Sequence, residues 1–281
     1  MQIITTIQAL RDALDWRRQN KALGLVITKG HLHGGSEALI DASVAANDLT
    51  VVASYAGAHL FFDQDAYQAH SQIPHLETAR LEERGVDLLF APGEAELYPT
   101  GHDGLTRIAL PKIGCNALMG AEKVHCQELV TLVTKFCNIT QPNMLILGEK
   151  HYQLLHLAER TLADLNLATQ VRRVPVVREA DGLVIATRNS ALSELERARA
   201  PLLYQTLKDI AHAIGDGARH FDKLEQTARI ALRGGHFKTE YVTICDAQTL
   251  LPPDQATQDY RILGAAHMGN VRLIDNVYVS T

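Results

Sequence analysis

The stretch Gly24-Leu25-Val26-Ile27-Thr28-Lys29-Gly30-His31-Leu32-His33-Gly34-Gly35-Ser36-Glu37-Ala38-Leu39 combines a short apolar run, a glycine-bearing turn and the start of a helix. The apolar run is typical of a buried strand, and residues 36–46 have the composition of a helix. Glycines let a backbone approach a ligand closely, and the first N–H groups of a helix lack partners within it. This order therefore suggests a phosphate site at the turn. The turn is neither a GxGxxG nor a Walker A sequence, so spacing alone leaves an ordinary strand-to-helix turn equally open.

The same alternation continues over the first two-thirds of the chain. Ile7, Leu10 and Leu14 lie at helical spacing behind the possible caps Thr5 and Thr6. Further strands are predicted at residues 49–54, 86–90 and 144–147, an extended segment at 168–177, and helices at 75–84, 128–136 and 149–165. Strands that alternate with helices predict a parallel sheet covered on both faces, with ligands beyond the carboxyl ends of its strands.

The pattern changes after about residue 174. Residues 179–182 form a turn signal, two or three helices are predicted between 192 and 232, and three strands follow at 241–245, 261–263 and 271–279. We therefore expect an α/β domain over residues 1–176 and a smaller α+β domain over residues 177–281.

Composition excludes several classes of function. The formal net charge is −5 and the basic residues are spread along the chain, which argues against a nucleic-acid partner. Since apolar runs stay well below ~18 residues, no membrane span is expected. The N-terminus lacks the features of a signal peptide, so we expect a cytoplasmic protein. The cysteines, which form no CxxC pair, are expected to be reduced thiols: Cys115, Cys126, Cys137 and Cys245.

Two further segments carry chemistry that suits phosphate. Gly148-Glu149-Lys150-His151 follows a predicted strand, and a lysine there can reach phosphate oxygens as a point charge. Ala186-Thr187-Arg188-Asn189 lies just past the domain change, where an arginine can clamp phosphates. Each segment alone is equally compatible with an ordinary surface residue.

Together these motifs resemble the pantothenate synthetase (pantoate–β-alanine ligase) family from end to end. The family's TMGxLHxGH turn corresponds to residues 28–36. Its other motifs correspond, in order, to Asp87-Leu88-Leu89-Phe90-Ala91-Pro92 with Tyr98-Pro99, Gln141-Pro142-Asn143 with Leu147-Gly148-Glu149-Lys150-His151, Asp181-Gly182-Leu183 with residues 186–189, and Arg272-Leu273-Ile274-Asp275-Asn276.

The resemblance implies a Rossmann-like nucleotidyltransferase domain, a lid-like C-terminal domain and a homodimer. It also implies that a small carboxylic acid attacks the α-phosphate of Mg²⁺-bound ATP to form an acyl-adenylate, which an amine, β-alanine in the family, converts to an amide. The implied catalytic residues are His33, Ser36, Lys150 and Arg188. The implied ATP-binding residues are Thr28, Lys29, Gly30, His33, Gly35, Ser36, Gly148, Lys150, His151, Thr187 and Arg188. The implied acid pocket contains Ala58, Phe61, Lys123, His125, Gln153 and Leu154.

Departures from the family pattern concentrate at these positions. The second histidine of the turn is Ser36, the methionine next to the turn is Lys29, the aspartate after the lysine is His151, and the first serine of Ser-Ser-Arg-Asn is Ala186. The family's Arg-Pro-Gly-His-Phe-Arg-Gly stretch is shortened to residues 123–128.

The acid pocket changes most. The family segment Phe-Val-Asn-Pro-Met-Gln-Phe corresponds to residues 56–62, so that its asparagine becomes Ala58 and its glutamine Phe61, while a second glutamine becomes Leu154. Because unpaired hydroxyls are costly to bury, we hypothesise that pantoate is used inefficiently, with a more apolar acid in its place or with adenylation lost. Compensated drift within a working pantothenate synthetase is the alternative.

Other functions stay open at this point. A non-catalytic nucleotide- or metabolite-binding paralogue is favoured by Ser36, His151 and Ala186, and a nucleotidyltransferase that stops at the adenylated product is a third hypothesis. No metal site is expected, although imidazoles bind zinc and one cleft would gather His31, His33, His59, His125 and His151 if the family fold holds.

Overall fold

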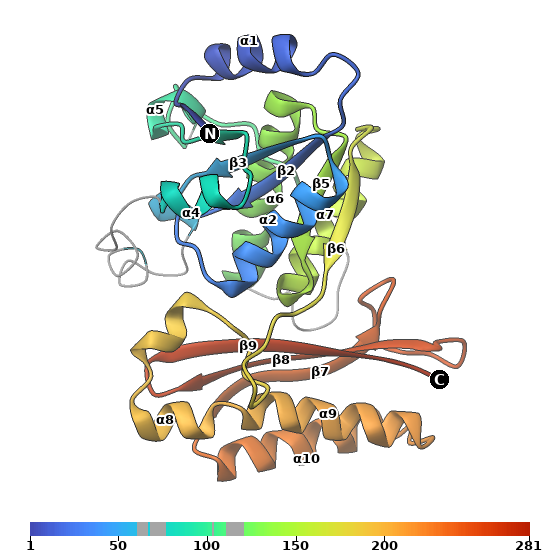
Figure 1. Ribbon diagram of the computed structural model, residues 1–281. Coiled ribbons are helices and arrows are strands. Elements are labelled where there is room, and N and C mark those ends of the chain that lie inside the picture. The colour runs from blue at the N-terminus through green and yellow to red at the C-terminus, as the bar shows by residue number, and fades with distance from the viewer. Residues whose placement is uncertain (61–66, 68–76, 103, 111–120) are drawn as a thin grey trace. The chain divides into compact units, whose positions relative to one another are not determined.

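The computed structural model describes residues 1–60, 67, 77–102, 104–110 and 121–281. These residues form two compact units (Figure 1). The first unit comprises the described residues of Met1–Leu110 together with residues 121–175. The second unit comprises Val176–Thr281.

A parallel six-stranded sheet forms the centre of the first unit. Its order is β1-β4-β3-β2-β5-β6. The strands are β1 (Gln2–Ile4), β2 (Leu23–Thr28), β3 (Leu49–Ser54), β4 (Leu88–Phe90), β5 (Met144–Gly148) and β6 (Gln170–Val174). The predicted α/β fold is confirmed. Strand β1 escaped prediction because three residues are too short to show a periodic pattern.

Helices cover both faces of this sheet (Figure 1). Thr6 caps the first helix through its hydroxyl, as the sequence suggested. The helices are α1 (Ile7–Arg17), α2 (Gly34–Ala46), α4 (Thr78–Glu83), α5 (Glu94–Leu97), α6 (Ala121–Thr140) and α7 (Tyr152–Asp164), with the short turns η1 (Ala58–Leu60) and η2 (Glu149–His151).

Successive residues of each strand enter different cores because strand side chains alternate between faces. Leu25 and Val51 pack with Phe136 of α6, on the face that α1, α6 and α7 cover. Val26, the next residue along, packs with Ile40 of α2 on the opposite face. Burial on both faces explains why the strands read as continuous apolar runs.

Strand β2 is the point at which the order of the sheet reverses. From β2 the chain adds β3 and then β4 on one side, and β5 and β6 on the other. In open parallel sheets, ligands bind beyond the carboxyl ends of the strands at such a reversal. The turn after Thr28 lies at this position.

The second unit packs helices against a three-stranded antiparallel sheet. The strands are β7 (Lys238–Asp246), β8 (Asp259–Met268) and β9 (Val271–Ser280). The helical segments are η3 (Thr187–Ala191), α8 (Glu194–Arg199), α9 (Leu202–Gly215) and α10 (Phe221–Gly234). Leu207, Leu232 and Ile262 belong to the core between them, which agrees with the predicted α+β arrangement.

A buried ion pair in this unit joins Asp275, which belongs to a quoted motif, to Arg178, which precedes the motif that begins at Asp181. Arg178 donates to both carboxylate oxygens of Asp275, at 2.6 and 2.8 Å. The guanidinium also lies 3.6 Å from the ring centroid of Tyr204, against which Gly182 packs. The motif around Asp275 therefore contributes to the internal structure of the unit.

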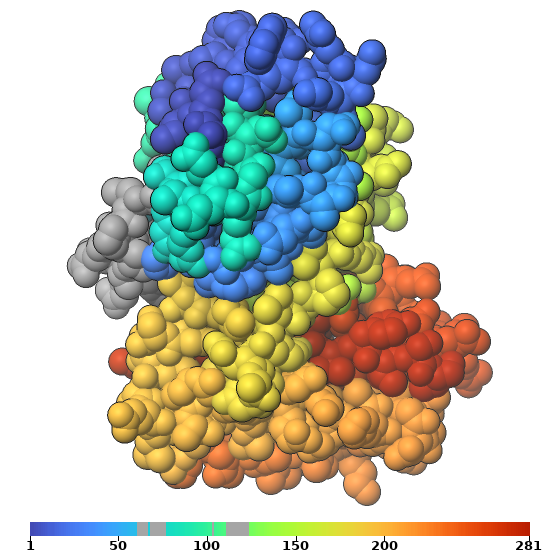
Figure 2. All heavy atoms as spheres, in the orientation of Figure 1, coloured from blue at the N-terminus to red at the C-terminus, as the bar shows by residue number. Residues whose placement is uncertain are grey.

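On the surface of the first unit, α4 and α2 lie side by side (Figure 2) and are connected by ion pairs, Arg80 with Glu37 and Arg84 with Asp41. Within the described ranges, no helix has the length and apolar character needed to cross a bilayer. Cys126, Cys137 and Cys245 are buried and form no disulfide with another described residue, and Cys115 lies outside the described residues.

Candidate active site

The turn between β2 and α2 is built around Thr28 and Gly30. The Thr28 hydroxyl accepts a hydrogen bond of 2.8 Å from the backbone N–H of Gly30. Gly30 has a φ of +97°, and a Cβ there would lie 3.3 Å from Ser54 Oγ on β3. Both restrictions favour glycine, which keeps this part of the turn free of side chain.

His33 caps helix α2 through its ring. Its Nδ1 accepts hydrogen bonds from the backbone N–H groups of Gly35 and Ser36, at 3.0 and 3.3 Å. The Ser36 hydroxyl accepts from the His33 N–H at 2.8 Å and lies 2.9 Å from the His33 carbonyl, to which it donates. The two residues form a reciprocal capping box. In this geometry the Ser36 hydroxyl supports the turn.

The cap fixes the protonation state of His33. Because Nδ1 accepts two N–H groups, the proton of the neutral ring resides on Nε2, which becomes a donor. Burial, followed by electrostatic interactions with Lys150 and His31, lowers the pKa of His33 to about 4, against a smaller opposing effect of Glu37. His33 therefore presents a neutral N–H group at neutral pH.

Lys150 reaches the same region from the neighbouring strand. β2 and β5 pair in parallel with Val26 opposite Ile146, so their carboxyl ends lie at one edge. Gly148 ends β5, and Lys150 follows in η2, half-buried and within electrostatic range of His33. The fold thus brings His33 and Lys150 together, although they are far apart in the sequence. His151 follows Lys150 and is exposed.

A third strand end adds a group of ring side chains on the other side of β2. Thr28 is paired with Ser54 at the end of β3, and Tyr55 and η1 follow. His59 Nε2 lies 3.2 Å from the Tyr98 hydroxyl, and the His59 ring centroid is 3.9 Å from that of His102. Burial, and then His102, lowers the pKa of His59 to about 4. Burial raises the pKa of Tyr98 to about 12.

Lys29 connects the turn to this group. Its ammonium donates a 2.5 Å hydrogen bond to the carbonyl of Leu60, the last residue of η1. The side chain is half-buried. Lys29, which the resemblance implied as an ATP contact, is thus directed toward the segment that corresponds to the family's acid pocket.

The other implied acid-pocket residues occupy several elements. Ala58 is exposed in η1, Gln153 and Leu154 are half-buried in the first turn of α7, and His125 is half-buried in α6. Phe61 lies outside the described residues, and only the backbone of Lys123, in α6, is described. The implied contacts Thr187 and Arg188 belong to the second unit, where Arg188 donates to the carbonyl of Arg272 at 3.0 Å.

Sequence reasoning missed Tyr55 and His102, which no motif marked. The rings of Tyr55, His59, Tyr98 and His102 contact one another and join the segment after β3 to the segment after β4. His59 and Tyr98 are 39 positions apart in the chain. Only the pairing of these strands, Ala53 opposite Phe90, brings the two segments together. Tyr98 was quoted as part of a motif without a role.

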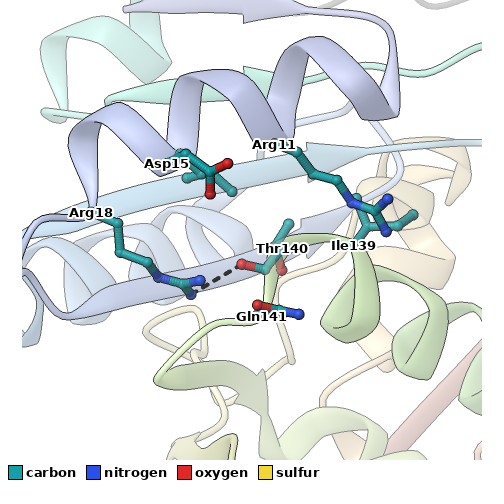
Figure 3. Close-up of a pocket in the computed structure, with 7 residues that line it drawn as sticks. Arg11, Asp15, Arg18, Ile139, Thr140 and Gln141 are labelled. Atoms are coloured by element: carbon teal, nitrogen blue, oxygen red, sulfur yellow. Dashed lines mark hydrogen bonds between the residues drawn. The ribbon is translucent and has the colours of Figure 1, made fainter.

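The histidines do not combine into a metal centre within the described parts of the chain, where no group of three or more His, Cys, Asp or Glu side chains can hold an ion. The hollow in Figure 3, about 280 Å³ in volume, is not part of this site either. It is lined by Arg11 of α1, by Arg18, which caps the end of α1, and by Thr140 and Gln141, which precede β5. It therefore lies at the amino ends of the strands.

Known proteins share this arrangement over the whole chain. The family model described as Pantoate-beta-alanine ligase matches residues 2–278. Pantothenate synthetases of Thioalkalivibrio sulfidiphilus and Pseudomonas fluorescens are 39% and 36% identical, with 99% and 100% of this chain and 98% of each relative covered.

Among solved structures, a pantothenate synthetase from Thermus thermophilus is similar with a TM-score of 0.87, 33% identity and full coverage of both chains. A pantoate-beta-alanine ligase from Francisella tularensis, described as complexed with beta-gamma ATP and beta-alanine, has a TM-score of 0.76 and 27% identity and covers 99% of this chain and 97% of that one. With a matching family model and relatives above 30% identity, both over nearly its full length, the chain belongs to the pantoate–β-alanine ligase family.

Proposed function

We propose that this chain condenses pantoate with β-alanine, using ATP, which is cleaved to AMP and pyrophosphate. The observation that carries the proposal is the pairing of His33 and Lys150 at the reversal point of the sheet. His33 is held as a neutral Nε2–H donor, and Lys150 brings a positive charge from the next strand. The two groups suit the phosphates of a nucleotide, and the glycines of the turn let those phosphates come close to the backbone.

In the first step, a pantoate carboxylate oxygen attacks the α-phosphorus of ATP and pyrophosphate leaves. We assign to Lys150 and the His33 N–H the stabilisation of negative charge that accumulates on the phosphate oxygens. In the second step, the β-alanine amine attacks the activated carbonyl and AMP leaves. The chain's contribution is to hold the reacting groups in place and to stabilise charge.

Mg²⁺ fits this donor set as an ion that enters with the nucleotide. Thr28, Gly30, His33 and Ser36, which hold the turn, carry no negative charge, so they suit phosphate oxygens, and Mg²⁺ would enter with the nucleotide. When bound, Mg²⁺ supplies charge neutralisation on the phosphates.

We assign binding of ATP and the acid to residues 1–176, and a covering role to residues 177–281, which would bring Thr187 and Arg188 to the nucleotide. We also expect a homodimer, as in the family implied by the sequence. Light scattering coupled to size-exclusion chromatography tests the dimer, and an Arg188→Gln variant with a raised KM for ATP would support the covering role.

A single assay distinguishes this proposal from its alternatives. The protein is incubated with ATP and D-pantoate, with and without β-alanine, and pyrophosphate and pantothenate are measured. Pyrophosphate together with pantothenate supports the ligase. Pyrophosphate without amide indicates an enzyme that stops at the adenylate, and no pyrophosphate with pantoate or a panel of apolar acids indicates a binding paralogue. Neither the described residues nor the comparisons support the apolar-acid or inactive alternatives.

A further inference from the structure

We propose that a basic hollow in the second unit binds a small molecule that carries a phosphate group. The hollow has a volume of about 340 Å³ and is lined by Arg229, Arg233, Phe237, Lys238 and Thr239. Pockets of this size accept small molecules. None of these residues belongs to the motifs quoted for the family, and binding there does not depend on the proposed ligase reaction.

The hollow forms where the end of α10 meets the beginning of β7. Glu225, Arg229 and Arg233 are spaced four residues apart on α10, so they lie along one side of the helix. The first two pair with the backbone of β7, which is an edge strand. The Glu225 carboxylate accepts a 2.9 Å hydrogen bond from the Ile244 N–H, and Arg229 donates to the Val242 carbonyl at 2.9 Å. The row thus reaches the first residues of β7 with Arg233.

Arg233 and Lys238 bring positive charge to this hollow without a matching acid. Arg229 is paired with Glu225 at 3.2 Å. Neither Arg233 nor Lys238 forms an ion pair within the part of the chain that the structure describes. Glu240, the next acid along the strand, is held by two other side chains. The hollow therefore carries a net positive charge that a bound anion would balance.

Other roles of the two cations account for only part of this arrangement. An arginine in the last turn of a helix interacts favourably with the helix dipole, which is a sufficient reason for Arg233 by itself. A lysine on an edge strand discourages pairing with another chain, which is a sufficient reason for Lys238 by itself. Neither role requires the two side chains to line the same cavity.

Thr239 adds a polar group to the lining. Its hydroxyl oxygen is buried and has no hydrogen-bond partner among the described residues. Buried polar atoms are normally hydrogen-bonded, so this oxygen calls for an explanation. Because Thr239 lines the hollow, rotation about χ1 to another staggered position can turn the hydroxyl toward a ligand there.

The chemistry of the lining indicates a phosphate-bearing anion. A guanidinium presents paired N–H donors that match two oxygens of one phosphate, and an ammonium binds phosphate as a point charge. A hydroxyl can donate to a third oxygen. A phosphate group has the charge and the acceptors for these groups together, whereas a monocarboxylate would leave one of the cations unbalanced. Inorganic phosphate, pyrophosphate and phosphate esters share this chemistry.

The test follows binding at the second unit by NMR of the full-length protein. Amide signals of residues 229–239 are recorded while pyrophosphate is added, which locates the binding independently of any activity. Arg233→Gln and Lys238→Gln each remove one charge, and Thr239→Val removes the hydroxyl. Lys223→Gln is the matched control, because Lys223 is exposed in the first turn of the same helix. Circular dichroism confirms that each variant is folded.

We expect pyrophosphate to shift the signals of residues 229–239 in wild-type protein until they saturate. Arg233→Gln and Lys238→Gln should each weaken this binding by about fivefold, the effect of losing one exposed charge contact, and Lys223→Gln by less than about twofold. Thr239→Val should weaken binding without changing its dependence on salt. In wild-type protein, added salt should weaken binding, because it screens exposed charges.

The titration is repeated with inorganic phosphate and with AMP to identify the source of the phosphate group. Saturation with inorganic phosphate and pyrophosphate alone would indicate a site for a free phosphate anion. Saturation with AMP as well would indicate a site that also admits phosphate esters. Both outcomes support the proposal.

Three results would overturn the proposal. The first is the absence of saturable shifts in residues 229–239 with all three probes. The second is equal weakening in Lys223→Gln and Arg233→Gln, since binding would then follow the overall charge of the surface. The third is self-association of Lys238→Gln with no anion bound by wild-type protein, which would assign the charge to protection of the edge of β7.

Discussion

His33 and Ser36 hold each other in place at the start of α2: the imidazole accepts the N–H of Ser36, and the Ser36 hydroxyl accepts the N–H of His33 at 2.8 Å. This relationship gives a role to the serine that replaces a family histidine. The serine cannot add charge at the proposed phosphate site, but it orders the His33 ring. The substitution is therefore compatible with a working site.

Replacing Ser36 with alanine should remove one side of the capping box. We expect a loss of about 1 kcal/mol in the free energy of unfolding, the usual cost of a lost cap, and a lower kcat because His33 becomes less ordered. Urea denaturation and steady-state kinetics measure the two effects. Ser36→Thr keeps the hydroxyl and serves as the control. Equal kcat in Ser36→Ala and wild type would show that the box does not order His33 for catalysis.

His33 should contribute to stability in a defined pH window. Its pKa is lowered to about 4 in the folded protein, below the value of about 6.5 in an unfolded chain. The unfolded state then binds more protons between these values, so this contribution is fully present above about pH 6.5 and is lost as the pH falls toward 4. His33→Asn keeps an N-cap that does not titrate. Its unfolding free energy should fall less over this window than that of wild type, and an NMR titration of the ring assigns the pKa directly. An ordinary, unshifted His33 pKa in wild type would contradict the cap geometry.

Lys150 should affect both chemistry and the titration of His33. Lys150→Met removes a charge that lowers the His33 pKa, so this pKa should rise. The same variant should lose most of its kcat, by about 100-fold, the typical effect of removing one group that stabilises transition-state charge. Lys150→Arg keeps the charge and should retain the low pKa. An unchanged His33 pKa in Lys150→Met would show that the two groups are not close enough to interact.

The sequence predicts the individual helices and strands better than it predicts which of them lie next to each other in the fold. Leu25-Val26-Ile27 and the other apolar runs identified the buried strands because burial on both faces leaves a continuous signal. The order of the sheet, and with it the neighbourhood of His33 and Lys150, depends on long-range pairing that no local pattern encodes. The motifs supplied those two residues through resemblance.

Roles within the site were harder to predict than positions. The sequence did not indicate that the Ser36 hydroxyl engages the backbone of its own turn or that Lys29 bonds to the Leu60 carbonyl. The phosphate contact of Ser36 and the ATP contact of Lys29 stay predictions. In both cases the side-chain direction is set by contacts that form only when the turn is folded.

The Arg178–Asp275 pair should be a major contribution to the stability of the second unit. The Asp275 side chain is 3% exposed and that of Arg178 17%, so Asp275→Asn leaves a buried guanidinium without its counter-charge. We expect a loss of about 3 kcal/mol in unfolding free energy. The exposed pair Arg197–Asp181, with exposures of 36% and 43%, is a matched control, and Asp181→Asn should cost less than about 1 kcal/mol. Equal losses in the two variants would contradict the role assigned to burial.

Alanine variants of two glycines in the second unit can distinguish the cost of backbone strain from the cost of a steric clash. Gly182 and Gly217 have nearly the same φ, +93° and +95°. A Cβ at Gly182 would lie 2.4 Å from Tyr204 Cδ1, whereas a Cβ at Gly217 meets nothing within 4 Å. Gly217→Ala should therefore cost only the left-handed backbone penalty, about 1 kcal/mol. Gly182→Ala should cost clearly more, because the Tyr204 ring must also shift, which disturbs its stacking on Arg178. Urea denaturation of both variants gives the difference. If Gly182→Ala were no more destabilising than Gly217→Ala, the Tyr204 ring would be free to shift, and its stacking on Arg178 would contribute little to the fold.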